Sequence, residues 1–525
     1  MSRLLIVSHD VIGERMAGVG IRYYEIARTL ARDSALQVIL AAPTGSTLPA
    51  SISDFGGRFV TYSTQDVSTL DGVICDCDVL LAYPDIIWQC RATLERLNKP
   101  AVVDGYDITL LEHLERDANR VPSDEKLRWH ADYWRMMQYV LERGDFFVVA
   151  TERQRDWWLG ALAASGRINP LTYQTGPSLR QLVDLLPYGL PQQEPVHTRP
   201  VMRGVIEGIN PDDKIVLWGG GCWEWLDPLT LIHAAAQIVP QRPDVKIVFP
   251  GLSHPARDRV PDMAIQQRTV DLARQLGLFG RNVFIGEWVP YEDWQNYLLE
   301  SDVGVSLHRD HLEARFSART RILSYIWAGL PMVLTCGDEL AERVAQAGAA
   351  VLVEEQNPAA VAAAILGLLD HPRQHRSIAW DELRRSLSWS QAVQSLRRFC
   401  ARPARAPDAA WRRSLSAPQP AHSSPVASAD NPAQASMNLE PISPHLPLLA
   451  ELPELRLPAP TTFIGRLLAS FLDRLIFWRF IPMIRQQNQI NRSVLQSLAA
   501  LQNDIQAQRE HTQAAIEDLA KWQRW

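Results

Sequence analysis

The chain has 525 residues, of which 46% are hydrophobic and 8% aromatic, so it can bury two ordinary cores and still leave a tail. A net charge of −6 excludes the basic field of a nucleic-acid-binding protein. The six scattered cysteines exclude a paired zinc site and a disulfide framework, and they favour a reducing cytoplasm.

The first forty residues predict a strand, a glycine loop and a helix, which is how a doubly wound domain begins. The apolar run Leu4 to Val7 is too short for a signal peptide, and no stretch approaches a membrane span of about 20 apolar residues. The loop that follows holds Glu14, Arg15, Gly18 and Gly20. Its glycines would let a ligand approach the backbone, although tight turns use the same residues.

Further strand-like runs predict a parallel sheet covered on both faces; they lie at 36–41, 79–82, 101–103, 146–150 and 183–186. Asp104 and Asp107 follow one of these runs at its C-terminal end, where open α/β sheets bind ligands. Either aspartate could accept a hydrogen bond from a ligand hydroxyl. A turn or helix-capping role is an equal alternative.

A second series of strands, loops and helices is predicted after about residue 213, so we expect a second domain. Its first strand runs into Gly219, Gly220 and Gly221, and another strand ends before Gly251. Backbone N–H groups of consecutive glycines can curl around an anion, so we expect ligand contact at this loop.

Residues 311–331 bring an acid, three arginines and a predicted helix start into one loop after a strand. The uncapped N–H groups of such a helix and its arginines would hold a diphosphate, while an acid at the lip would accept hydrogen bonds from sugar hydroxyls. A surface loop with solvated arginines is the alternative. The residues concerned are Glu313, Arg315, Ser317, Arg319, Thr320 and Arg321.

The last quarter of the chain changes in composition. Residues 402–460 contain twelve prolines and many alanines and serines, which predicts a disordered linker. Residues 461–525 predict a basic amphipathic helix, suited to a membrane interface, and then a loose heptad that would join copies of the chain in a coiled coil. Alternatively, the aromatic residues of this tail simply pack against a partner copy.

Three segments resemble one family: Trp327-Ala328-Gly329-Leu330-Pro331, Gly219-Gly220-Gly221 before Trp223, and Phe249-Pro250-Gly251. With two doubly wound domains, they resemble the GT-B glycosyltransferases, in particular the retaining bacterial polysaccharide and lipopolysaccharide sugar transferases (glycosyl transferases group 1). The resemblance covers about residues 1–400. It implies Rossmann-like domains at 1–195, on the acceptor side, and 196–401, on the nucleotide-sugar side, before the linker and the tail.

The sequence departs from that family at its acidic motif. The family usually carries two glutamates, but Phe316 and Ser324 stand at those positions, and Glu313 is the nearest glutamate. Glu224 and Asp227 occupy the stretch where the family has an arginine and a lysine. A clamp moved to other arginines would keep the chain an enzyme, whereas a non-catalytic binding scaffold that oligomerises through its tail is the alternative.

The resemblance implies transfer of a sugar from a nucleotide-diphosphate sugar to a glycan or lipid-linked acceptor, in a cytoplasmic protein at the inner face of the membrane. No cofactor is expected; Asp76-Cys77-Asp78 matches a metal-using pattern, but it abuts a strand in a domain of another type. A glycoside hydrolase and a dehydrogenase lack their usual motifs here. From the residue patterns above, we expect Glu313, Arg319, Arg321 and Asp107 to serve catalysis; Gly219, Gly220, Gly221, Arg315, Ser317, Thr320 and Gly251 to bind the donor; and Glu14, Arg15, Gly18, Gly20 and Asp104 to lie on the acceptor side.

Overall fold

The first sheet has seven parallel strands in the order β3-β2-β1-β4-β5-β6-β7. The computed structural model describes residues 1–48, 55–117, 122–371 and 378–416. Aliphatic runs form these strands because both faces of the sheet are buried. The strands are β1 (Ser2–Val7), β2 (Leu36–Pro43), β3 (Arg58–Tyr62), β4 (Val79–Ala82), β5 (Ala101–Asp104), β6 (Phe146–Val149) and β7 (Val183–Leu185).

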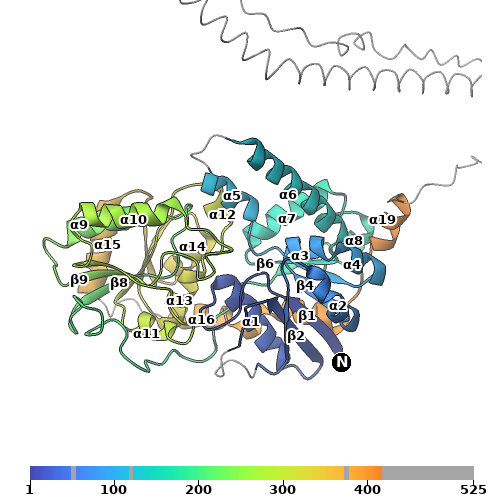
Figure 1. Ribbon diagram of the computed structural model, residues 1–525, viewed down its shortest axis with the longest axis horizontal. Coiled ribbons are helices and arrows are strands. Elements are labelled where there is room, and N and C mark those ends of the chain that lie inside the picture. Colours follow the sequence, from blue (N-terminus) through green and yellow to red (C-terminus); the bar gives the residue numbers. More distant parts are fainter. Residues whose placement is uncertain (49–54, 118–121, 372–377, 417–525) are drawn as a thin grey trace, which may run out of the picture. The chain divides into compact units, whose positions relative to one another are not determined.

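Helices cover both faces of this sheet (Figure 1). One face packs on α1 and the other on α2, α3, α4, α6 and α7. These elements are α1 (Gly18–Ala31), the short 3₁₀ helix η1 (Val67–Leu70), α2 (Asp71–Asp76), α3 (Pro84–Gln89), α4 (Arg91–Leu97), α5 (Thr109–Asp117), α6 (Asp124–Arg143), α7 (Glu152–Ala164) and α8 (Pro170–Gln174). We call this sheet with its helices the first lobe.

The second sheet has six parallel strands in the order β10-β9-β8-β11-β12-β13. Together with its helices it forms the second lobe, and both lobes belong to one compact unit, Met1–Pro420. The strands are β8 (Lys214–Trp218), β9 (Val245–Phe249), β10 (Val283–Ile285), β11 (Val303–Ser306), β12 (Met332–Thr335) and β13 (Ala350–Val353).

Helices α9, α10 and α15 cover one face of the second sheet, and α11, α13 and α14 cover the other. Asp227 caps α9 and Pro228 is its first residue, a favoured start, while α13 ends at Gly329, whose φ of +65° suits glycine. The helices are α9 (Pro228–Ile238), α10 (Ala264–Gln275), α11 (Trp294–Leu299), α12 (Leu312–Phe316), α13 (Thr320–Ala328), α14 (Glu339–Gln346) and α15 (Pro358–Asp370).

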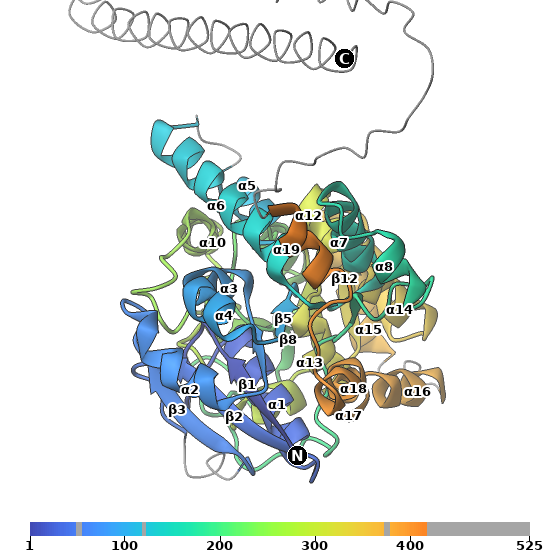
Figure 2. The same ribbon diagram turned by 90° about the vertical axis from the view of Figure 1, so that its right-hand side faces the viewer.

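The chain then returns to the first lobe. It does so before residue 401, where the second domain was predicted to end. Trp389, Leu396 and Cys400 lie in the same core cluster as β1 and α1, and Figure 2 shows α17 and α18 beside α1. Burial of these side chains explains why the segment leaves the second lobe. The helices after the crossing are α16 (Ile378–Ser386), α17 (Trp389–Ala392), α18 (Gln394–Ala401) and α19 (Ala409–Ser416).

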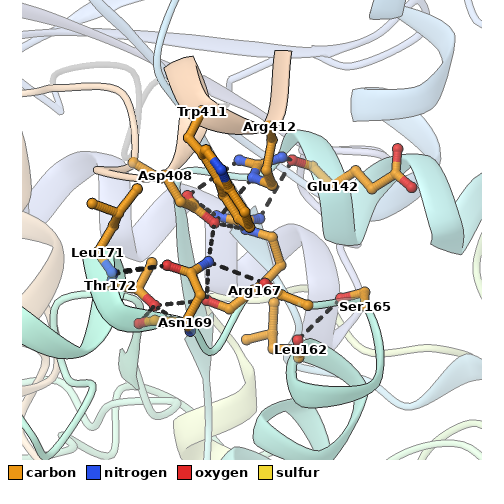
Figure 3. A network of polar contacts seen from close by, with 12 residues as sticks. Glu142, Leu162, Ser165, Arg167, Asn169, Leu171, Thr172, Asp408, Trp411 and Arg412 are labelled. Carbon is orange, nitrogen blue, oxygen red and sulfur yellow. Dashed lines mark hydrogen bonds and ion pairs between the residues drawn. The ribbon is translucent and has the colours of Figure 1, made fainter. Parts of the chain in front are cut away.

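A buried ion pair fixes the start of α19, within the segment predicted to be linker (Figure 3). Asp408 and Arg167 are both fully buried and meet at 2.9 Å, and Asn169 donates to the same carboxylate at 3.1 Å. Arg412 on the first turn of α19 also pairs with Asp408, at 3.0 Å. Residues 402–416 therefore belong to the folded first lobe, whereas the predictions for 461–525 lie outside the described residues.

Candidate active site

A cavity of about 920 Å³ lies where strands of both sheets end. Loops after β1, β5, β8, β9, β10 and β11 line it, so it occupies the C-terminal edge at which open parallel sheets bind ligands. The cavity therefore brings together the glycine loop of each lobe and most of the residues singled out between 313 and 321.

Glu313 and Arg319 form an ion pair on the wall of this cavity. Glu313 is 4% exposed, Arg319 is 7% exposed, and the carboxylate Oε2 accepts from the guanidinium Nη2 at 2.6 Å. His311 positions the short helix α12 because its Nδ1 accepts from the Ala314 N–H at 3.1 Å. Within the described part of the chain, the Nε of Arg319 is buried without a hydrogen-bond partner. It is a donor that a bound ligand can use.

Arg321 lies beneath the glycine loop of the second lobe. Its Nη2 donates to the Gly221 carbonyl at 2.8 Å, and its guanidinium lies 4.7 Å from the centre of the Trp218 ring. Burial lowers the pKa of Arg321 to about 10, so it remains a cation at neutral pH. Its Nη1 is buried with no hydrogen-bond partner among the residues described. Arg321 is therefore a second cationic residue of the cavity, besides Arg319, with a donor that has no protein partner among the described residues.

Helix α13 begins at the cavity. Arg319 is its N-cap residue and supplies no side-chain cap, so the first N–H groups of the helix lack that partner. Ser317 and Thr320 line the cavity beside it, although the Ser317 hydroxyl donates back to the Ala314 carbonyl at 3.2 Å. A helix start with two guanidinium groups favours an anion.

The glycines of the second lobe have different roles. The Gly219 N–H donates to the Tyr325 hydroxyl at 2.7 Å, so it is already occupied. A Cβ at Gly221 would lie 2.6 Å from the Trp223 ring, and one at Gly251 would lie 2.9 Å from Trp288 Cα. Gly220 alone of the three consecutive glycines has a positive φ, +108°, with open space around it. The loop is therefore built partly for packing and partly for backbone approach to a ligand.

Three carboxylates of the first lobe line the cavity: Asp10, Asp107 and Glu112. Burial and the neighbouring Asp104 raise the pKa of Asp107 to about 7, and burial with Asp107 raises the pKa of Glu112 well above its usual value. In the second lobe, outside the cavity lining, Asp338 caps α14, and burial raises its pKa to about 6 against the lowering effect of Arg319. Groups that titrate near neutrality can exchange protons with a substrate hydroxyl.

The predicted site left out Glu112, Asp338 and Asp10, of which Glu112 and Asp10 line the cavity and Asp338 interacts electrostatically with Arg319. Glu112 lies on the amphipathic helix α5, where it looks like an ordinary exposed glutamate, and its burial arises from packing of α12 against α5. Asp10 follows the end of β1 by three residues, and this position near a strand end was the one signal that could have pointed to it.

Several predicted site residues do not reach the cavity. Arg315 is exposed, with its guanidinium 5.6 Å from the Phe316 ring, because α12 turns it outward. Glu14 and Arg15 are exposed beyond the lining. Gly20 is a packing residue, since a Cβ there would lie 2.5 Å from the Val11 carbonyl oxygen. Of the four residues predicted in that loop, Gly18 is the one that lines the cavity.

Asp104 is also removed from the predicted acceptor site. Its carboxylate accepts two hydrogen bonds from Arg22, each 2.9 Å long, and Arg22 also donates to the Leu186 carbonyl. Both side chains are buried and neither lines the cavity. The aspartate therefore joins β5 to α1 instead of contacting a ligand, whereas Asp107 does line the cavity.

The described residues hold neither a metal cluster nor a helix that could cross a membrane. No group of histidine, cysteine, aspartate or glutamate in that part of the chain could hold a metal ion. Asp78 accepts from the Arg3 N–H at 2.8 Å, away from the cavity. None of the described helices is both long enough and apolar enough to cross a membrane. The absence of a cofactor stays a prediction.

Comparison with known proteins identifies the second lobe. Residues 213–371 match the family model "Glycosyl transferases group 1". This region contains the glycine loop, Glu313, Arg319 and Arg321, so the prediction of a glycosyltransferase enzyme is confirmed by this domain. None of the curated proteins matches the chain in sequence.

Solved structures share the fold at low identity. Sucrose-phosphate synthase from Thermosynechococcus elongatus is 17% identical with a TM-score of 0.52, over 80% of this chain and 100% of that one. Anabaena HepE in complex with UDP and glucose is 12% identical with a TM-score of 0.56, over 79% and 100%. An E. coli trehalose-6-phosphate protein bound with UDP-2-fluoro glucose is 12% identical with a TM-score of 0.51, over 77% and 100%. These similarities confirm the predicted two-lobed GT-B fold.

Proposed function

We propose that this chain, whose residues 213–371 form a glycosyltransferase domain, moves a sugar from a nucleotide-diphosphate sugar to a glycan or lipid-linked acceptor of a cell-surface polysaccharide. The observation that carries the proposal is the pair of buried guanidinium groups, Arg319 and Arg321, with unfilled donors at the start of α13. HepE was solved with UDP and glucose, and the E. coli protein with UDP-2-fluoro glucose, which supports UDP-sugars as the first donors to test.

In the proposed reaction the bond between the anomeric carbon and the diphosphate oxygen breaks, and the acceptor oxygen forms the new bond to that carbon. Negative charge grows on the diphosphate as it leaves, and Arg319, Arg321 and the start of α13 stabilise it. Glu313 orients Arg319 through their 2.6 Å contact. Because the positive charge comes from side chains, we propose a reaction without a metal ion.

The acceptor loses a proton as its oxygen attacks. Asp107 lines the cavity from the first lobe, and its pKa of about 7 suits a group that takes up this proton near neutral pH. For a retaining reaction, the departing diphosphate oxygen is a second acceptor for the same proton. Retention of the anomeric configuration is part of the proposal because the resemblance implies it.

The tail, outside the described residues, would complete the proposal through its sequence. Its basic amphipathic segment would bring a cytoplasmic enzyme to the inner face of the membrane, and its heptads would join copies of the chain. Both roles stay predictions and rest on residues 461–525 alone.

A non-catalytic scaffold is the second candidate. Ser324 and Phe316 line the cavity where the related transferases carry two glutamates, and Glu224 stands where they carry a cation. Glu224 here accepts from the Ile265 N–H at 3.0 Å and pairs with Arg268, so it holds its loop against α10. A scaffold would bind nucleotides without breaking their bond to the sugar.

Donor hydrolysis separates the two candidates. Purified full-length chain is incubated with UDP-, GDP-, ADP- and dTDP-sugars, and released nucleotide is measured beside calorimetric binding of each nucleotide. We expect binding and slow release from one class of donor, with release abolished in Arg319→Ala. Binding without release by any donor identifies the scaffold, and no binding at all contradicts both candidates.

A further inference from the structure

Four aromatic rings form a row along the cavity wall of the second lobe. In order they are Trp225, Trp223, His254 and Trp288, and all four line the cavity. Successive ring centres are 6.2, 6.3 and 6.2 Å apart, with interplanar angles of 25°, 42° and 44°. We call these four rings the aromatic row.

Neighbouring residues hold the row in place. Glu224, between the first two tryptophans, is 8% exposed and is fixed by the Ile265 N–H and by Arg268. Gly221 and Gly251 leave room for Trp223 and Trp288, because a Cβ at either glycine would come within 3.0 Å of the tryptophan. Two glycines that the sequence assigned to the donor therefore seat rings of the row.

A buried carboxylate faces the middle of the row from the first lobe. Asp10 is 7% exposed, and its Oδ2 lies 3.3 Å from His254 Nε2. His254 Nδ1 accepts from the Ala256 N–H at 3.1 Å, so the ring proton is on Nε2. Burial raises the pKa of Asp10, but His254, His9 and the Val11 N–H together outweigh burial and lower the pKa of the carboxyl. No hydrogen-bond donor of good geometry reaches Oδ2 from the described residues.

This combination selects a ligand class. Sugar rings present C–H groups on one face and hydroxyls at their edges, so they stack on aromatic faces and donate to a carboxylate. Each step of the row is comparable to the length of one pyranose unit. A phosphate would meet the negative charge of Asp10, so the row disfavours the diphosphate, whereas Arg319 and Arg321 attract it.

We propose that the aromatic row is a platform for successive neutral sugar units of a glycan acceptor, with Asp10 accepting hydrogen bonds from their hydroxyls. That the bound glycan is the acceptor rests on the proposed function, because only a sugar transfer reaction has an acceptor. It extends acceptor contact from the first lobe, where the sequence placed it, to the second.

The test measures binding of the full-length chain to an array of neutral oligosaccharides, graded from single sugars to hexamers of hexose, 6-deoxyhexose and N-acetylhexosamine units. The best oligosaccharide and UDP are then titrated by calorimetry into the wild type and the variants. Affinity should rise with length and level off once the row is covered. Trp225→Ala and Trp288→Ala should each weaken the oligosaccharide about tenfold, or roughly 1.4 kcal/mol, and leave UDP within twofold.

Two variants control the measurement. Trp134→Ala removes a tryptophan that is 59% exposed and outside the cavity, so it should change neither affinity. Trp225→Phe keeps an aromatic face and should retain most of the oligosaccharide affinity. Thermal unfolding of each variant verifies that it is folded.

Each outcome decides the inference. A wild type that binds no oligosaccharide overturns it, and so does a loss of UDP affinity in the tryptophan variants without a loss of oligosaccharide affinity. Oligosaccharide binding in a chain that binds and cleaves no nucleotide sugar would leave the platform standing and refute the proposed transfer instead. Transfer with unaltered kinetics in both alanine variants would refute the platform alone.

Discussion

Two buried arginine–carboxylate pairs of this protein have opposite relations to the cavity. In the first lobe Arg22 and Asp104 make two contacts of 2.9 Å and are enclosed by β5, α1 and the chain after β7. In the second lobe Arg319 and Glu313 make one contact of 2.6 Å and line the cavity. Both pairs follow strands at the C-terminal edge of a parallel sheet.

The difference shows that access, and not residue type, separates a structural pair from a binding pair. An enclosed pair uses its donors to join elements, and breaking it strands a charge where water cannot enter. Each arginine has one buried donor without a partner among the described residues, Nη1 in Arg22 and Nε in Arg319, but only Arg319 lines the cavity that a ligand can enter. The predictions below test this distinction.

The largest effect should follow from breaking the enclosed pair. Asp104→Ala leaves Arg22 buried and unpaired, so we expect a loss of about 3–5 kcal/mol in the free energy of unfolding, measured with urea. Asp293→Ala, which breaks a pair whose arginine is 59% exposed, should change the free energy of unfolding far less than Asp104→Ala, because solvent screens an exposed pair. A small loss for Asp104→Ala would mean that the first pair is not structurally important.

The cavity pair should act on ligand affinity instead. Arg319→Ala and Arg321→Ala should each weaken binding of the nucleoside diphosphate by about 1.5–3 kcal/mol, the scale of a hydrogen bond to a charged group. Arg315→Ala is the matched control. Arg315 is only four residues before Arg319 in the sequence, but its side chain is exposed and does not line the cavity. Calorimetry on folded variants measures this, and unchanged affinity in both cavity variants would place the diphosphate elsewhere.

A third effect should appear in the pH dependence of stability. An aspartate ordinarily titrates near 3.9, whereas the pKa of Asp107 is raised by burial to about 7. The folded chain therefore binds more protons than the unfolded chain between about pH 4 and 7, and stability falls as the pH rises through that range.

Removing this carboxylate should lessen that fall. Asp107→Asn should lose less stability between pH 4 and 7 than the wild type, as measured by urea unfolding at several pH values. Asp156→Asn, at an exposed position, should follow the wild-type curve. Identical curves for wild type and Asp107→Asn would show that Asp107 titrates normally.

The smallest effect concerns the glycine loop beside the cavity pair. Gly220→Ala puts a side chain at a φ of +108° in open space, so only backbone strain opposes it, and we expect a loss of about 1–2 kcal/mol in unfolding free energy. Gly72→Ala, on the exposed helix α2 with open space, should instead stabilise by roughly 0.5–1 kcal/mol. Equal effects would mean that Gly220 is not needed for its conformation.

Much of the fold followed from local patterns. Buried aliphatic runs bounded by glycine, proline and capping residues predicted most of the strands of both sheets, because such patterns depend on neighbours in the sequence. The predicted domain boundary at residue 401 was wrong. The chain returns to the first lobe before that residue, where Trp389 joins the core, and Asp408 in the proline-rich stretch pairs with Arg167. Composition alone does not indicate these contacts.

The sequence by itself determined two Rossmann-like lobes, a cavity at their strand ends, and a loop at 313–321 that supplies Glu313, Arg319 and Arg321 to it. Only the tertiary structure decided which polar residues face that cavity. Asp104 and Asp107 are three residues apart, yet one is enclosed by Arg22 and the other lines the cavity. Glu112 and the aromatic row become part of the site only through packing of distant segments. Whether a side chain reaches the cavity depends on contacts between residues far apart in the chain. A local sequence pattern does not reveal those contacts.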